Sequence, residues 1–122
     1  MEAELVASGR FARIETRGTV SGLARTVTIG FVDDAAVPGA ILVAAGTPTT
    51  AWATNLLADP ACRVELADRS FDAIAEPLEP SEHAGAVREL ILRYGTPAER
   101  LGHGASFRLR PVESVPSGDP RP

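Results

Sequence analysis

The sequence predicts a mainly β protein of the α+β class, in which six strands and two helices form a closed or split antiparallel barrel. Three observations support this class. Short segments with strand-like alternation or β-branched runs recur along the chain. Glycine, proline and aspartate separate these segments, and only two segments carry helix signals. Closure suits many short strands because it removes exposed strand edges.

The N-terminal half contains three predicted strands. Residues 10–17 alternate strictly between two sets of side chains, which is the period of a strand. A glycine-bounded turn over residues 18–22 leads into residues 24–32, a β-branched run that predicts the second strand. The Asp33–Asp34 pair is expected to lie in a solvated loop. Residues 40–45 are continuously apolar, as in a strand that is buried on both faces.

A short helix and a hairpin follow. Thr49 and Thr50 are alternative N-caps for the helix, which ends at Asp59–Pro60. Residues 61–67 and 70–78 alternate on either side of a two-residue turn, which predicts two paired strands.

The longer helix begins at Pro80 and carries apolar residues at helical spacing as far as Tyr94. Gly95 follows as its stop signal, and His83 is expected on its surface. Residues 105–112 alternate again and predict the last strand. The expected order is therefore strand, strand, strand, helix, strand, strand, helix, strand.

The chain has 122 residues, which corresponds to one domain. We expect the barrel to span residues 10–112, after an N-terminal extension over residues 1–9. Residues 113–122 contain three prolines and no periodic apolar pattern, so they predict a flexible tail.

Composition excludes several classes of function. The net charge is −4, which argues against a nucleic-acid partner, whose binding surface would be basic. All 12 basic residues are arginine, so any anion held by a side chain is held by a guanidinium group, and a Schiff-base lysine is excluded. No segment has the roughly 20 apolar residues that span a bilayer, and no signal peptide is evident, so a cytoplasmic location is expected.

The chain offers little for cysteine or metal chemistry. Cys62 is the only cysteine, and its apolar neighbours favour a buried and inert thiol. His83 and His103 lie far apart, with no further metal ligands at short spacing. No metal site is therefore predicted.

Two clusters of residues resemble those of the deazaflavin-dependent nitroreductase family. The first is the turn from Gly18 to Arg25, and the second runs from Trp52 through Asn55 to Pro60. The resemblance implies a six-stranded antiparallel split β-barrel, like that of flavin-binding pyridoxamine phosphate oxidases. It also implies an oxidoreductase that uses coenzyme F(420), a deazaflavin, to transfer hydride to a nitro compound, a quinone or an activated alkene. FMN is the alternative cofactor, and some relatives of this barrel bind haem.

The same resemblance implies a cofactor-binding site. Its residues would be Ser21, Gly22, Arg25, Ala45, Gly46, Thr47, Thr50, Trp52 and Asn55. Glycine turns and helix N-termini can present backbone N–H groups to an anion. Structural alternatives stay open: a plain hairpin at the turn, an N-cap at the threonines, core packing by Trp52 and a corner hydrogen bond by Asn55. No catalytic residue is identified beyond Tyr94, the only phenol, which is either a proton donor or a packing residue.

A second hypothesis follows from one departure from the family pattern. Basic residues normally follow the first glycine of the turn, where this chain has Thr19 and Val20. The alternative function is therefore a small-molecule-binding or non-redox split barrel that has lost the cofactor. In either case the limited core favours a homodimer.

Overall fold

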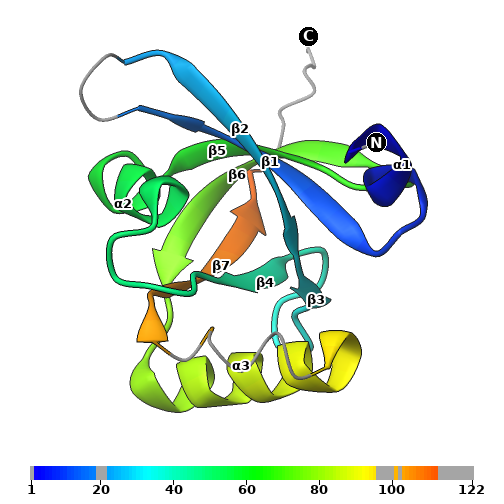
Figure 1. Ribbon diagram of the computed structural model, residues 1–122, viewed down its shortest axis with the longest axis vertical. Helices are drawn as coiled ribbons and strands as arrows, with labels where there is room; N and C mark the ends of the chain where they lie inside the picture. Colours follow the sequence, from blue (N-terminus) through cyan, green and yellow to red (C-terminus); the bar gives the residue numbers. More distant parts are fainter. Residues whose placement is uncertain (1, 19–21, 96–100, 102, 113–122) are drawn as a thin grey trace, which may run out of the picture.

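A single curled antiparallel sheet forms the body of the protein in the computed structural model (Figure 1). The structure describes residues 2–18, 22–95, 101 and 103–112. The strands are β1 (Phe11–Arg17), β2 (Ala24–Gly30), β3 (Val32–Asp33), β4 (Ile41–Ala44), β5 (Ala61–Glu65), β6 (Ser70–Pro77) and β7 (Ser106–Pro111). Their order in the sheet is β2-β1-β5-β6-β7-β4-β3. The α+β class is confirmed, and the expected order of elements differs from the observed one by an additional strand before α2 and an additional helix at the start.

The predicted count of six strands is wrong, because the run predicted over residues 24–32 is two strands. Phe31 separates β2 from β3, and the described chain contains seven strands. β2 pairs with β1 at one end of the strand order, and β3 pairs with β4 at the other end. Since one run supplies both end strands, the sheet curls round on itself.

The predicted count of two helices is also wrong. The described residues contain α1 (Glu2–Ala7), α2 (Ala51–Ala58) and α3 (Pro80–Tyr94), and α1 is the additional helix. Val6 of α1 is only 5% exposed, and Gly9 with φ of 84° lets the chain turn into β1. None of the helices seen in the described ranges has the length and apolarity to cross a bilayer. The predicted domain bounds stay a prediction, and residues 113–122 lie outside the described residues.

The core fills the inside of the curled sheet. The alternation predicted for β1 is confirmed, since Ala12, Ile14 and Thr16 are buried and the residues between them are more exposed. Phe107 and Leu109 of β7 are fully buried in the same cluster. Apolar burial of this kind contributes roughly 25 cal/mol for each Å² removed from water and is the main stabilising term.

β4 is buried on both faces, as its continuous apolar sequence predicts. Ile41 and Val43 point into the main core, while Ala44 belongs to a second cluster with Leu90 of α3. Figure 1 shows α3 lying across the lower end of the sheet, where it covers this second cluster.

α3 begins and ends where the sequence predicts. Glu79 and Glu82 form a reciprocal capping box, and Gly95 with φ of 87° follows the last turn. His83 does not lie free on the helix surface as expected. It is partly buried, and its Nδ1 lies 2.7 Å from Oγ of Ser106 at the start of β7.

Candidate functional site

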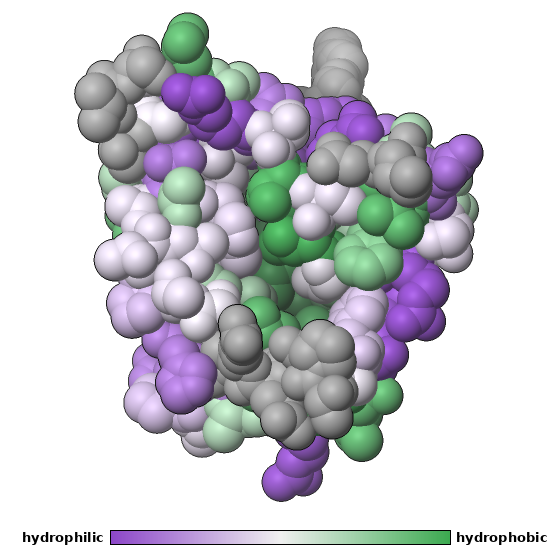
Figure 2. Space-filling view, viewed as in Figure 1, coloured by the Kyte–Doolittle hydropathy of each residue, from purple (hydrophilic) through white to green (hydrophobic). Residues whose placement is uncertain are grey.

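A recess lined by hydrophobic side chains opens between α2 and β2, on the face shown in Figure 2. Val27 and Ile29 of β2 and Trp52 of α2 are partly buried and pack against the core. The Trp52 ring lies 6.1 Å from the ring of Phe107. Trp52 therefore packs on the core, as the structural alternative predicts, while part of its surface stays accessible.

Arg25 lies on β2, two residues before Val27. It is the register partner of Thr16 in the β1–β2 pair, so both side chains leave the sheet on the same inward face as Val27. Arg25 is exposed and forms no ion pair or hydrogen bond with the residues that the structure describes. Its guanidinium group is therefore free to bind an anion in or beside the recess.

The turn that leads to Arg25 is closed by its own backbone. Ser21 lies outside the described residues. Gly22 has φ of 73°, and its N–H donates to the carbonyl of Gly18 at 3.0 Å. The Arg17 side chain donates to the carbonyl of Gly22 at 2.9 Å. The N–H of Gly22 is therefore used inside the turn and is not available to an anion.

Three threonines precede α2 and bond to one another. Thr50 occupies the N-cap position, but its side chain makes no cap hydrogen bond. Its hydroxyl instead lies 3.0 Å from that of Thr47, which also lies 3.5 Å from that of Thr49. The first N–H groups of α2 are therefore not capped by Thr50, and such groups favour an anion.

Gly104 packs closely against the backbone of the loop formed by Ala45, Gly46 and Thr47. Ala45 is 1% exposed, and its N–H donates to the carbonyl of Ala105 at 2.8 Å. A Cβ atom at Gly104 would lie 2.5 Å from the carbonyl oxygen of Ala45 and 2.7 Å from that of Thr47, so only glycine fits. A Cβ atom at Gly46 would meet open space. The loop thus carries the Thr47 hydroxyl, and its backbone carbonyl groups pack against Gly104.

A buried hydrogen bond links the second cluster of the sequence resemblance to β1, the strand that precedes the turn. Nδ2 of Asn55 donates to Oγ1 of Thr16 at 3.0 Å, and these residues are 8% and 2% exposed. Asn55 therefore joins α2 to β1 through a side chain rather than through a backbone group. The inward position of Thr16 in the alternation of β1 was the only sequence signal for this contact.

Tyr94 lies outside the recess, at the end of α3. Its hydroxyl accepts hydrogen bonds from the N–H of Phe31 and from Nε of Arg93, each at 3.0 Å, and donates to the carbonyl of Arg10. Its ring lies against Gly30, where a Cβ atom would approach to 2.9 Å. These contacts hold the break between β2 and β3 and assign the phenol a structural role.

Asp34 is not the solvated residue that the sequence predicts. It is buried and pairs with Nε of Arg108, which also donates to Glu82 at 2.8 Å. Burial alone would raise the pKa of Asp34, but hydrogen bonds from Arg108 and from the N–H of Ala36 outweigh it and lower the pKa. No sequence signal identified this pair, because its members lie 74 positions apart.

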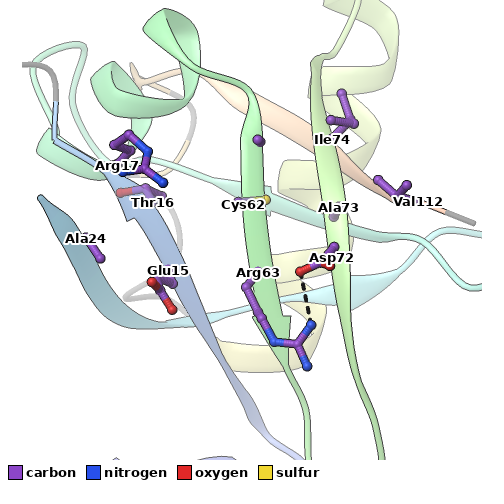
Figure 3. Close-up of a pocket in the computed structure, with 11 residues that line it drawn as sticks. Glu15, Thr16, Arg17, Ala24, Cys62, Arg63, Asp72, Ala73, Ile74 and Val112 are labelled. Carbon is purple, nitrogen blue, oxygen red and sulfur yellow. Dashed lines mark hydrogen bonds and ion pairs between the residues drawn. The ribbon is translucent and has the colours of Figure 1, made fainter. Parts of the chain in front are cut away.

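A second cavity of about 310 Å³ lies on the outer face of β1, β5 and β6 (Figure 3). Arg63 and Asp72 form an ion pair of 3.0 Å across it, so the cation is already satisfied. Cys62 is buried, as predicted, and burial raises the pKa of its thiol to about 12, which favours the protonated form. Among the described residues, this groove offers no free cation for a phosphate.

The curled half-barrel sheet, with an apolar recess between α2 and β2 and an exposed arginine on β2, defines a small α+β protein. The chain belongs to the F(420)H(2)-dependent quinone reductase family, whose sequence model matches residues 5–98. This match confirms the resemblance to deazaflavin-dependent reductases. No curated protein matches the chain.

Solved structures share the fold at low sequence identity. An F(420)-H(2) dependent reductase is 24% identical with a TM-score of 0.68, over 82% of this chain and 93% of that chain. HutZ, the heme storage protein from Vibrio cholerae, is 17% identical with a TM-score of 0.67, over 92% and 88%. A heme-binding protein from Mycobacterium smegmatis is 16% identical with a TM-score of 0.66, over 90% and 50%. At these identities the likeness shows the fold alone.

Proposed function

We propose that the chain is a reductase that binds reduced coenzyme F(420) in the recess between α2 and β2. The acceptor would be a small organic molecule: a quinone, a nitro compound or an activated alkene. The observation that carries the proposal is the Arg25 guanidinium, which has no partner among the described residues and leaves β2 on the same face as Val27 of the apolar wall. Membership of the quinone reductase family supports the same cofactor.

The donor set fits this coenzyme, which combines a planar ring with an anionic tail. Arg25 supplies a planar cation, while Thr47 and the uncapped N-terminus of α2 supply neutral donors. Val27, Ile29 and Trp52 supply the apolar wall that a ring system needs. Ser21, Ala45, Gly46 and Thr50 complete the proposed binding set. Gly22 belongs to it through the shape of the turn, and Asn55 through the position that it gives α2.

The coenzyme would supply the hydride, and the protein residues would orient it and exclude water. The apolar wall lowers the local dielectric constant, which strengthens the attraction between Arg25 and an anionic group. Tyr94 is not assigned a catalytic role, because its hydroxyl is engaged with backbone groups. We therefore assign the residues of the recess to binding and orientation.

The alternative function is a split barrel that binds a small molecule without redox chemistry. Thr19 and Val20 stand where the family carries basic residues, so fewer charges are available for a phosphate. FMN stays the alternative cofactor. Two structural neighbours are described as a heme storage and a heme-binding protein, so haem belongs among the ligands that are tested.

Titration of the purified protein with F(420), FMN and haem, followed by fluorescence and absorbance, tests the proposal. We expect micromolar or tighter binding of F(420). Arg25→Ala should weaken it about 10- to 100-fold, because a charge-assisted hydrogen bond contributes about 1.5–3 kcal/mol. Arg88→Ala, on an exposed face of α3, is the matched control and should change nothing. Binding of haem alone, or of none of the three, would overturn the proposal.

The outer groove of Figure 3 is the face that we assign to a homodimer. Ile74 and Val112 are 39% and 44% exposed beside it, and Arg63 and Asp72 present both charge signs to a symmetric copy. Ile74→Glu should convert a dimer to a monomer in analytical ultracentrifugation. A wild-type mass of one chain at micromolar concentration would contradict this assignment. The expected cytoplasmic location stays a prediction.

A further inference from the structure

We infer that Thr16 and Asn55 are positioning residues, whose buried hydrogen bond sets the place of Arg25 relative to α2. The inference rests on the proposed function, since it concerns how the same recess holds an anionic cofactor. Neither side chain is assigned a contact with the cofactor in this inference. Both act through the geometry of Arg25 and of the helix.

The hydrogen bond joins the two walls of the recess. Thr16 lies on β1 directly opposite Arg25 on β2, and neighbouring strands are about 5 Å apart. Asn55 lies on α2, three residues after Trp52, so it shares a side of the helix with that ring. A 3.0 Å bond between Thr16 and Asn55 therefore relates Arg25 to Trp52 through two rigid elements.

The other described contacts between α2 and the sheet are apolar packing and one exposed ion pair, in which Nε of Arg17 lies 3.8 Å from Oδ2 of Asp59 at the C-cap. Ala53 and Leu56 are the other buried residues of α2, and both pack in the apolar cluster that includes Ile14. Apolar contacts are not directional, so they permit a helix to shift along the sheet. A hydrogen bond requires a distance and an angle, and it fixes the helix along the strand direction.

Stability alone does not call for this polar pair. Replacing both partners of a buried hydrogen bond with apolar groups of the same shape is often nearly neutral for stability. The Thr16–Asn55 pair is 2% and 8% exposed, and it lies among residues that would accept such a replacement. What the polar pair adds is a defined geometry between β1 and α2, which is what a preorganised anion site needs.

The test begins with Thr16→Val, which keeps the shape of the side chain and removes the hydroxyl. We expect F(420) affinity to fall about 10-fold, within the coupling range of residues in one hydrogen-bond network. Thr16→Ser retains the hydroxyl and should stay within about 2-fold of wild type, at the low end of that range. In an Arg25→Ala background, Thr16→Val should have no further effect, because the residue that it positions is gone. An equal loss in both backgrounds would overturn the inference.

Two further measurements separate positioning from folding. The double variant Thr16→Val/Asn55→Leu should retain the wild-type urea midpoint while binding F(420) as weakly as Thr16→Val. In the cofactor-free protein, the Nε–H resonance of Arg25 should shift in Thr16→Val and return in Thr16→Ser. Wild-type affinity in the double variant would refute the positioning role. Failure of the wild-type protein to bind F(420) would instead refute the proposed function, and the inference with it.

Discussion

Asp34 and Arg108 form an ion pair that is almost completely shielded from solvent. Their side chains are 3% and 12% exposed, and the pair joins the loop after β3 to β7. Arg108 also donates to Glu82 in the first turn of α3. One guanidinium group thus links three elements, and it does so on the side of the sheet that α3 covers.

Arg108→Met should destabilise the protein strongly. Removing one partner of a buried pair leaves an uncompensated buried charge, which costs about 3–5 kcal/mol. The free energy of unfolding, measured by urea denaturation at pH 7, should fall by that amount. The control is Arg110→Met, which disrupts the more exposed pair with Glu76 and should have a much smaller effect. Equal losses in the two variants would contradict the special role of the buried pair.

The same pair predicts a stability that decreases in acid. The pKa of Asp34 is lowered in the folded state, so its contribution is complete above the ordinary carboxyl value of about 4. The contribution is lost as the pH falls through the lower, folded-state pKa. Wild type and Asp34→Asn should therefore differ most in thermal midpoint near neutral pH and converge as the pH falls through the lowered pKa of Asp34. A difference that stays constant with pH would argue against this linkage.

Much of the fold follows from local sequence patterns, because the period of alternation reports which side chains are buried. Local patterns predicted β1, the hairpin of β5 and β6, and α3. They also predicted β4, which is buried on both faces. The short helix α1 was missed because six residues are too few to show a helical period. The break at Phe31 depends on pairing with β4, a contact that no local pattern encodes.

The candidate site could be predicted only in part for the same reason. Arg25 and Trp52 could be predicted as site residues because they lie in the segments that carry the family resemblance. The Thr16–Asn55 bond that joins α2 to β1 spans 39 positions, so no local pattern encodes how these segments are arranged. The prediction for Asp34 was wrong because an aspartate in a loop is usually solvated. Its partner Arg108 reaches it only in the folded chain.

Tyr94→Phe should lower stability without changing the reaction. The phenol oxygen accepts from the N–H of Phe31 and donates to the exposed carbonyl of Arg10, so its loss leaves the partly buried N–H of Phe31 without this partner. The cost of such a loss is about 1–3 kcal/mol. We expect a lower urea midpoint and an unchanged rate of hydride transfer from reduced F(420) at 25 °C. A large fall in that rate, with stability retained, would restore Tyr94 as a proton donor.

Gly104→Ala should displace the loop over residues 45–47 and weaken F(420) binding. The added methyl group would lie 2.5 Å from the carbonyl oxygen of Ala45 and 2.7 Å from that of Thr47, and neither backbone atom can rotate away. Overpacking of this kind costs about 1–3 kcal/mol, and the loop that carries Thr47 would have to move. Lower stability and weaker F(420) binding are therefore expected together.

Gly85→Ala is the matched control for that change. Gly85 lies inside α3, where a Cβ atom meets nothing within 4 Å, so alanine should stabilise the helix by about 0.5–1 kcal/mol. F(420) affinity should stay at the wild-type value, because α3 covers the far cluster rather than the recess. If Gly104→Ala binds F(420) as tightly as Gly85→Ala, the loop over residues 45–47 does not contribute to the cofactor site, and the proposed donor set reduces to Arg25 and the residues of α2.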